Sequence, residues 1–231
     1  MDQLVSKTIY ISLFMQILTT IVSAEGILDK LYLEDLILQD ILKLELFVQI
    51  IETSFYLWVI YALKNIKLMT PRRYIDWVIT TPTMLISTLI FLKYKDYKEQ
   101  KKKPFTFWEF LKDDWNMIQK ILLYNWLMLL FGYLGETNIL PKYQSIFIGF
   151  IFFYLSFSII YEYAKKTNEG TKLFYFLTIV WSMYGVSATF PIIPKNISYN
   201  FLDIISKNFY GLFIYYKVKQ LRVGKQDHII E

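Results

Sequence analysis

Seven long apolar stretches dominate this chain and leave little sequence for anything else. They lie approximately at 5–24, 41–63, 72–92, 115–135, 143–163, 172–193 and 198–218. A membrane-spanning helix needs about 20 mostly apolar residues, so each stretch is long enough to cross a bilayer. The sequence therefore predicts an all-α, multi-pass membrane protein, a seven-transmembrane-helix bundle that forms one domain over 1–231 with the lipid bilayer as its solvent.

The distribution of basic residues predicts the orientation of this bundle. Lysine and arginine gather in three groups, at 93–103, 165–172 and 217–225. With seven spans, all three groups fall on the same side, and the positive-inside rule makes that side cytoplasmic. We therefore expect the N-terminus outside and the C-terminus in the cytoplasm. A nucleic-acid patch at 93–103 is the less favoured alternative, and we expect no nucleic-acid partner.

Residue usage excludes several kinds of site. The chain has no cysteine and a single histidine, His228, in its polar tail. Disulfides, thiolate metal sites and histidine clusters are thus excluded, and we expect neither a bound metal nor an enzyme active site. No cleavable signal peptide is evident, so the first span is expected to serve as its own insertion signal.

Local patterns suggest how the spans are joined. Segment 25–40 alternates apolar and acidic residues, which predicts an amphipathic cytoplasmic loop, either an interfacial helix or an extension of the second span. Pro82 lies inside the third span and should kink it. Pro191 and Pro194 are expected to close the sixth span, and 168–170 to form the turn between the fifth and sixth.

Charged residues occur where the membrane should be driest. Lys207 lies near the middle of the seventh span with Asp203 four residues earlier, and Arg73 and Asp76 share a face of the third span. A lysine at the bilayer centre costs roughly 3 kcal/mol or more unless it is paired, so such residues are functional candidates. The alternatives are structural ion pairs that fix helix packing, or a secondary transporter that binds a substrate or coupling ion at Lys207 and Asp203.

Aromatic residues near these charges suggest a bound ligand. Trp77 adjoins Asp76, Trp181 and Tyr184 are three residues apart in the sixth span, and Tyr56 lies in the second. Such rings are usually core packing, but beside a buried lysine they could also wall a long, flat, apolar ligand. A desolvated lysine is a good nucleophile for forming an imine. Asp76 and Asp203 could then neutralise the charged imine.

Three motifs resemble one known family. Residues 73–82 read R-Y-I-D-W-V-I-T-T-P, residues 203–207 read D-I-I-S-K, and residues 181–184 read W-S-M-Y. They resemble the third, seventh and sixth helices of microbial (type 1) rhodopsins. The resemblance implies all-trans retinal as cofactor, bound to Lys207 through a Schiff base, with Asp76 and Asp203 as counterions and proton acceptor and Arg73 as the gate on the outer side. It also implies a retinal pocket made of Tyr56, Trp77, Thr80, Thr81, Asn125, Met128, Gly132, Trp181 and Tyr184.

Two residues depart from the family pattern. Gly185 replaces the proline that commonly follows W-x-x-Y, and Ala188 stands where many members have another tryptophan. We expect a roomier pocket and a less kinked sixth helix.

The features of an outward proton pump are incomplete. Eleven residues after Asp76, on the same helix face and about 16 Å further in, a pump should carry a carboxylic proton donor. That position holds Ser87, which cannot return a proton by itself. The outer segment 191–200 contains no carboxylate.

The second span instead carries a polar stripe. Glu45, Gln49, Glu52 and Tyr56 follow helical spacing, and rows of carboxyl groups attract cations. Ser12 and Gln16 in the first span and Asn208 in the seventh extend this stripe into a seam. We expect these residues to form an ion pathway along helices one, two and seven, the alternative being a hydrogen-bonded packing network.

Taken together, these features resemble the group 1 viral rhodopsins of giant algal viruses, which are light-gated cation channels. The resemblance implies that isomerisation from all-trans to 13-cis opens a path for monovalent cations or protons, in the host cell membrane if the chain is viral. The outer gate would comprise Arg73, Lys195, Asn196 and Asn200. A light-driven outward proton pump, a sensor that needs a transducer and a colourless secondary transporter are the alternatives. The sequence leaves a homo-oligomer open.

Overall fold

The computed structural model of the protein describes residues 3–62 and 66–223, and almost all of these residues are helical. In chain order the elements are α1 (Gln3–Ile27), the 3-10 turn η1 (Leu33–Asp35), α2 (Ile37–Ala62), the 3-10 turn η2 (Ile66–Leu68), α3 (Met69–Glu99), α4 (Phe107–Asp113), α5 (Trp115–Glu136), α6 (Lys142–Ala164), α7 (Asn168–Ala188), α8 (Ile192–Asp203), the π-helix η3 (Ile204–Asn208) and α9 (Phe209–Leu221).

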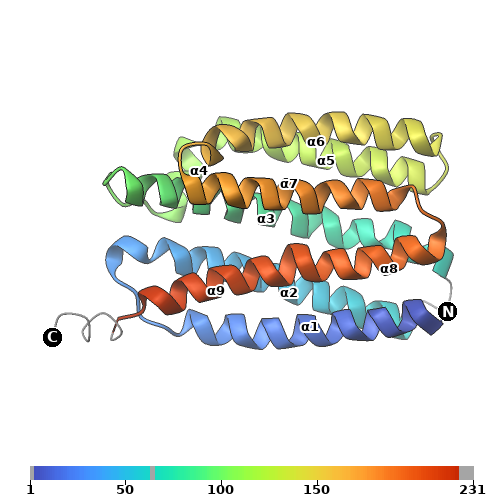
Figure 1. The fold of residues 1–231 in the computed structure, drawn as a ribbon, viewed down its shortest axis with the longest axis horizontal. Helices are drawn as coiled ribbons and strands as arrows, with labels where there is room; N and C mark the ends of the chain where they lie inside the picture. The colour runs from blue at the N-terminus through green and yellow to red at the C-terminus, as the bar shows by residue number, and fades with distance from the viewer. Residues whose placement is uncertain (1–2, 63–65, 224–231) are drawn as a thin grey trace.

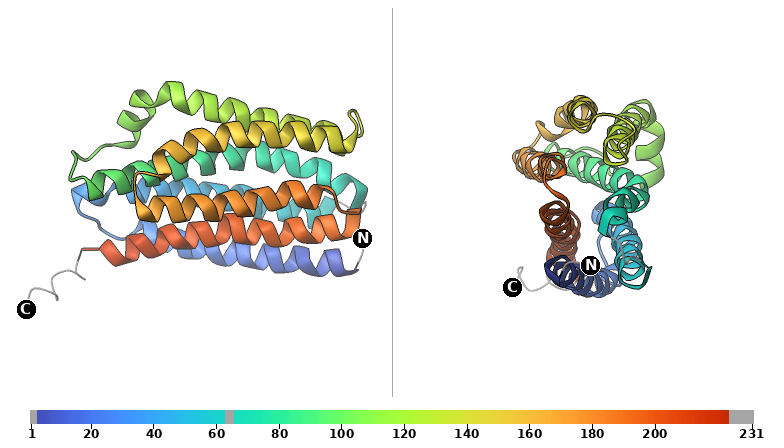
Figure 2. Two further views of the ribbon diagram at one scale, coloured as in Figure 1. Left: turned by 45° about the horizontal axis from the view of Figure 1, so that its top comes forward. Right: turned by 90° about the vertical axis from the view of Figure 1, so that its right-hand side faces the viewer.

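The long helices form the seven rods of the predicted bundle. The first six rods are α1, α2, α3, α5, α6 and α7, and η3 joins α8 and α9 into the seventh (Figure 1). Neighbours along the chain pack side by side; α8 returns to lie against α7 and α1, and α9 lies against α1 and α2. In the end-on view on the right of Figure 2, α1 lies at the bottom of the bundle and α5 and α6 lie at its top. The seven-helix fold is confirmed.

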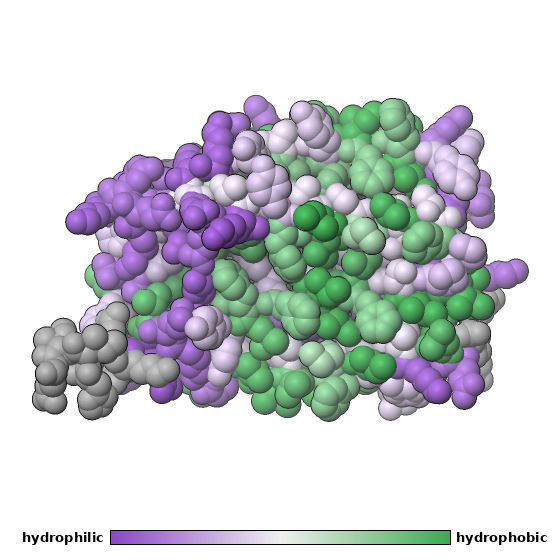
Figure 3. Space-filling model, in the orientation of Figure 1, coloured by the Kyte–Doolittle hydropathy of each residue, from purple (hydrophilic) through white to green (hydrophobic). Residues whose placement is uncertain are grey.

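The helix α1 is inverted in polarity relative to a helix of a water-soluble protein. Its outward face carries apolar side chains such as Phe14 and Ile21, which are 64% and 63% exposed. Its inward face carries five buried polar side chains at successive turns: Thr8, Ser12, Gln16, Thr19 and Ser23. On the face shown in Figure 3, apolar surface covers the middle of the bundle and hydrophilic side chains gather at its ends. Lipid therefore replaces water as the solvent of the outer face, and the protein is a membrane protein.

Five described segments have the length and hydropathy of a membrane span by composition alone: Gln3–Ile27, Leu33–Tyr61, Ile66–Glu99, Trp115–Glu136 and Lys142–Ala164. The seventh rod is divided into α8 and α9, which are 12 and 13 residues long. The boundary between the sixth and seventh spans differs from the prediction. The helix α7 ends at Ala188, and Pro191 precedes the first residue of α8 instead of closing the sixth span. Pro194 lies in the first turn of α8, where proline's missing N–H is no loss.

The connections also differ from the sequence expectations. The first loop forms no interfacial helix, because α1 continues to Ile27, Leu31 forms an isolated β-bridge with Arg222, and only the single turn η1 follows. The helix α2 begins at Ile37, so only the last four residues of segment 25–40 extend the second span. Residues 168–170 are not the turn but the first turn of α7, whose N-cap is Thr167. Pro82 lies inside α3, as predicted.

The three basic groups meet at one end of the bundle. Glu169 at the start of α7 is bound by Lys95 of α3 and Lys217 of α9, each with an N–O distance of 2.6 Å. The predicted common side is thus reproduced by the fold. The part of the third group at 224–225 and His228 lie outside the described residues.

Candidate functional site

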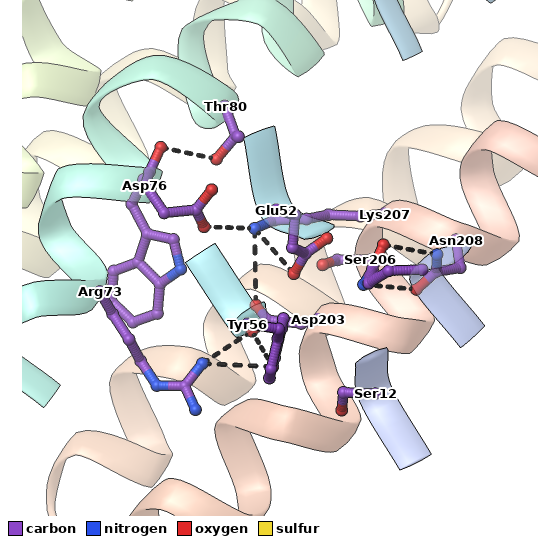
Figure 4. Close-up of polar contacts among 12 residues, drawn as sticks. Ser12, Glu52, Tyr56, Arg73, Asp76, Thr80, Asp203, Ser206, Lys207 and Asn208 are labelled. Carbon is purple, nitrogen blue, oxygen red and sulfur yellow. Dashed lines mark hydrogen bonds and ion pairs between the residues drawn. The ribbon is translucent and has the colours of Figure 1, made fainter. Parts of the chain in front are cut away.

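A buried lysine surrounded by carboxyl groups lies at the centre of the bundle (Figure 4). Lys207 Nζ donates to Asp76 Oδ2 at 2.8 Å and to Glu52 Oε1 at 3.0 Å, and it lies 3.7 Å from Asp203 Oδ1. All four side chains are at most 3% exposed. Glu52 comes from α2 and Asp76 from α3, whereas Asp203 belongs to the seventh rod itself, so this cluster ties two other rods to the seventh.

The local backbone places Lys207 within an unusual helix turn. Lys207 belongs to the five-residue π-helix η3, whose wider turn interrupts the seventh rod. Single π-turns inside α-helices are rare and are frequent at functional sites. Asp203 is the last residue of α8, one turn before Lys207, so the carboxyl group and the amine share a face as the sequence spacing predicts.

Towards the end of the bundle where α3 begins, Arg73 closes the cluster. Its guanidinium donates to Asp203 Oδ2 at 2.8 Å, to the Tyr56 hydroxyl at 3.3 Å and to the side-chain oxygen of Asn200. The Tyr56 hydroxyl in turn donates to Asp203 Oδ2 at 2.7 Å, and Tyr184 donates to Asp203 Oδ1 at 2.8 Å. Arg73, predicted as the outer gate, thus joins Asp203, Tyr56 and Asn200 in one hydrogen-bonded cluster, the Arg73 plug. Tyr56, predicted as a pocket residue, belongs to this plug instead.

An apolar cavity of about 120 Å³ begins at Lys207 and extends between α3, α5, α6 and α7. Six of the predicted pocket residues line it: Trp77, Thr81, Met128, Gly132, Trp181 and Tyr184. The further lining residues are Tyr74, Met84, Leu129, Ser145, Ile146, Gly149, Phe150, Phe153, Gly185, Ala188, Tyr199, Ser206 and Lys207 itself. Thr80 and Asn125 do not line it, because Thr80 donates to the Asp76 carbonyl and Asn125 donates to Thr81 from behind.

The ring of Phe150 occupies the space beside Gly185 that a side chain at this position would need. A Cβ on Gly185 would lie 2.5 Å from Phe150 Cζ, so any side chain there would displace this ring of α6. The helix α7 runs without interruption through Gly185. Phe150 packs against the position where the family commonly has proline, and both Gly185 and Ala188 line the cavity.

The polar seam between the first and seventh rods is closely hydrogen-bonded. Gln16 and Asn208 exchange two side-chain hydrogen bonds of 2.8 Å, and Asn208 also donates to Thr19. Nearer the outer end, Ser12 donates to the carbonyl of Asn200 at 2.9 Å, and Asn200 donates to Thr8 at 2.8 Å. The residues predicted to line this seam are thus brought together.

The stripe on α2 faces the same interior, and its members are fully buried. Ser87 of α3 donates to Glu45 Oε1, which joins the two residues that were considered separately in the sequence. Gln49 has no hydrogen-bond partner for either polar side-chain atom among the described residues. Glu52 reaches Lys207 itself.

The outer-gate residues of α8 face two different ways. Asn196 accepts a hydrogen bond from Thr70 at 3.2 Å, on the side of α3. Lys195 instead forms a buried ion pair with Glu136 at the end of α5, with N–O distances of 2.6 and 2.7 Å. Lys195 therefore lies away from the seam, while Arg73, Asn196 and Asn200 remain beside it.

Sequence reasoning missed two carboxyl contacts. Glu52 was interpreted as a pathway residue and is a third carboxyl partner of Lys207. Glu136 supplies the outer carboxylate that segment 191–200 lacks. The sequence did contain a signal for Glu52, because this residue lies on the polar stripe of the second span. The spacing within α2 does not say, however, how far α2 is shifted along the seventh rod and therefore which of its residues lies level with Lys207.

The comparisons with known proteins agree with this geometry. A sequence model of the family described as bacteriorhodopsin-like protein matches residues 7–221. The chain belongs to this family of microbial rhodopsins. Its members bind retinal, so retinal is the cofactor of this protein, and they are largely light-driven transporters or channels, not enzymes. No curated protein sequence matches the chain.

Solved structures share the fold over almost their whole length. The viral rhodopsin OLPVRII has a TM-score of 0.81 at 24% identity, covering 94% of this chain and 99% of that one. A light-driven proton pump from Leptosphaeria maculans has a TM-score of 0.73 at 14% identity, with coverages of 96% and 98%. Bromide-bound halorhodopsin from Halobacterium salinarum has a TM-score of 0.70 at 12% identity, with coverages of 95% and 97%. At these identities the likeness concerns the fold.

Proposed function

We propose that this rhodopsin is a light-gated cation channel whose retinal is attached to Lys207. The observation that carries the proposal is the polar interior between α1, α2 and the seventh rod, which contains two buried glutamates, Glu45 and Glu52, on one face of α2. Rows of carboxyl groups inside a bundle are the usual means of admitting cations. The permeant species would be monovalent cations or protons.

The cavity beside Lys207 fits retinal. Its walls are aromatic and aliphatic, it is narrow, and the amine stands at its end, where the nitrogen of the retinal adduct would lie. When bound, retinal supplies light absorption and a change of shape about its polyene chain. The protein's own residues would then surround the polyene and balance its charge. Trp77, Trp181 and Tyr184 would enclose the polyene, while Asp76 and Asp203 would neutralise the charged nitrogen.

Asp76 is the residue best placed to take up a proton. Its Oδ2 contacts Lys207, whereas its Oδ1 lacks a hydrogen-bond partner among the described residues. Neutralisation of Asp76 would weaken the attraction that holds the central cluster together. The Arg73 plug, which shares Asp203 with that cluster, would be the next contact to loosen.

The cytoplasmic half of the route is closed by apolar side chains. One and two turns beyond Glu45, the same face of α2 carries Ile41 and Leu38, and α9 presents Ile214 and Val218, all fully buried. Hydrophobic constrictions of this kind gate by excluding water. These four apolar side chains form what we call the apolar plug. In a channel, water must enter the apolar plug when the central cluster rearranges.

A voltage-clamp recording tests the channel proposal. In cells given retinal, a channel's photocurrent reverses its sign near the equilibrium potential of the permeant cation, and the reversal moves when that cation is exchanged. A photocurrent that stays outward at every voltage would overturn the channel proposal.

A second candidate, the outward proton pump, gains support from one contact. Ser87 occupies the position of the expected proton donor and is hydrogen-bonded to Glu45, so an acid from α2 replaces the missing acid of α3. The same recording decides between the two functions. The colourless transporter does not fit a retinal-binding family.

Attachment at Lys207 is tested separately by spectroscopy. Lys207→Ala should abolish the visible absorption band, because no other described lysine borders the cavity. Lys195→Ala, which removes a second buried lysine, should retain the band and serves as the control. A visible band in Lys207→Ala protein would refute the attachment site.

A further inference from the structure

Gln49 is a buried amide that the contacts described so far leave unexplained. Its side chain is fully buried, and neither Oε1 nor Nε2 has a hydrogen-bond partner among the described residues. An unpaired buried polar group costs about 1–3 kcal/mol, so such groups normally bind water, an ion or a partner.

The neighbours of Gln49 along α2 are the two buried glutamates. Glu45 lies four residues before it and Glu52 three residues after it, so all three side chains share one helix face. Glu45 Oε2 and Glu52 Oε2 also lack hydrogen-bond partners within the described part of the chain. Three oxygen atoms without partners thus follow one another over about 10 Å of helix.

Gly211 of the seventh rod makes room for this amide. A Cβ at position 211 would lie 2.2 Å from Gln49 Nε2 and 3.8 Å from Glu45 Cβ. The amide is therefore held by the shape of the α9 backbone, with no polar contact to fix it. Glu45 follows one turn further on, and beyond it α2 presents Ile41 and Leu38, so Gln49 and Glu45 are the last two polar steps of α2 before the apolar plug.

Resting on the channel proposal, we infer that Gln49 is a cation ligand and sets the preference of the route for alkali cations over protons. Alkali and other hard cations are bound by carboxyl and amide oxygens, which replace part of their hydration shell. A cation moving between Glu52 and Glu45 would pass Gln49 Oε1, whose amide group is seated against Gly211. A proton can pass between carboxyl groups through water and does not need the amide oxygen.

Gln49→Met tests the ligand directly, because it keeps the length of the side chain and removes both polar atoms. The reversal potential of the photocurrent should move toward the proton equilibrium potential, with the ratio of Na⁺ to H⁺ permeability falling about tenfold, the equivalent of about 1.4 kcal/mol. The matched control is Ile50→Met on the lipid-facing side of α2, where Ile50 is 47% exposed. It should leave the ratio unchanged.

Gly211→Ala tests whether the position of the Gln49 amide depends on the absence of a side chain at residue 211. The added methyl group should push Gln49 into the route and reduce the cation conductance while the visible absorption band is retained. In Gly211→Ala/Gln49→Ala protein the space is restored, so conductance should recover without the cation preference. Recovery of conductance distinguishes a blocked route from a misfolded protein.

The outcomes separate this inference from the channel proposal. An unmodified protein without a reversing photocurrent overturns the channel function, whatever the variants do. An unmodified protein with a reversing photocurrent, together with an unchanged Na⁺ to H⁺ ratio in Gln49→Met, overturns the role of Gln49 alone.

Discussion

The charges around Lys207 do not balance. Two cations, Lys207 and Arg73, face three carboxyl groups, those of Glu52, Asp76 and Asp203, in a region that is almost completely buried. An unpaired charge in such a place is very costly, so a carboxyl group that would carry the excess charge holds a proton instead. Asp203 accepts bonds from Arg73, Tyr56 and Tyr184, and Asp76 makes the shorter contact with Lys207. Glu52 is therefore the best candidate for the neutral group.

This assignment predicts different spectra for two isosteric changes. Glu52→Gln replaces one neutral group by another and should shift the absorption maximum only slightly. Asp76→Asn removes a charge at the nitrogen and should shift it strongly. The absorption maxima of the purified proteins, measured at one pH, check this. Equal shifts in both variants would contradict a neutral Glu52.

The same residues show what the sequence could predict. Arg73, Asp76, Asp203 and Lys207 were predicted together because each pair lies within one turn of a single helix, where spacing determines proximity. The contact between Glu52 and Lys207 depends on how far α2 is shifted along the seventh rod, which spacing within one helix does not report. The same reason explains why Tyr56 was assigned to the retinal pocket and lies at the Arg73 plug.

Among the elements, α7 is held at its N-terminal end by charge as well as by packing. Glu169 lies in its first turn and bridges Lys95 of α3 and Lys217 of α9. A carboxylate also interacts favourably with the N-terminus of a helix. This single side chain thus fixes the distance between α7 and two neighbouring rods.

Glu169→Gln should weaken that connection. Partly exposed ion pairs contribute roughly 0.2–1 kcal/mol each, so we expect a small loss of stability, seen as faster thermal bleaching at low salt and a smaller difference at high salt. The control is Glu162→Gln, which breaks an ion pair with Lys165 near the end of the same helix, α6, and joins no two rods. If both variants bleach equally fast, the bridge between rods has no special role.

Element boundaries were predictable where a residue forces them and uncertain elsewhere. Proline positions were recognised, but Pro191 was interpreted as an end and is a beginning, because proline is compatible with both sides of a short connection. The π-helix η3 has no sequence signature among its residues, and the pairing of Lys207 with both α2 and α3 is visible only in the fold.

At the scale of the whole molecule, the interior is divided into a polar half and a dry half. Along the bundle axis, between the level of Thr8 on α1 and the level of Glu45 on α2, the space between α1, α2 and the seventh rod is lined by hydrogen-bonding groups. Beyond Glu45, starting at the level of Ile41, the apolar plug fills this space. The basic groups gather at the end with the plug, as the bridge through Glu169 demonstrates. If the positive-inside rule holds, the polar half opens outward and the plug faces the cytoplasm.

This orientation can be tested cleanly because the chain has no cysteine. Ile139 is 65% exposed in the connection between α5 and α6, and Lys103 is exposed in the connection between α3 and α4, at the opposite end. In intact cells, a membrane-impermeant maleimide should label Ile139→Cys and not Lys103→Cys, and permeabilised cells should show both labelled. The reverse pattern would place the plug outside. Cations would then enter the polar half from the cytoplasm, and Arg73 would guard the inner mouth.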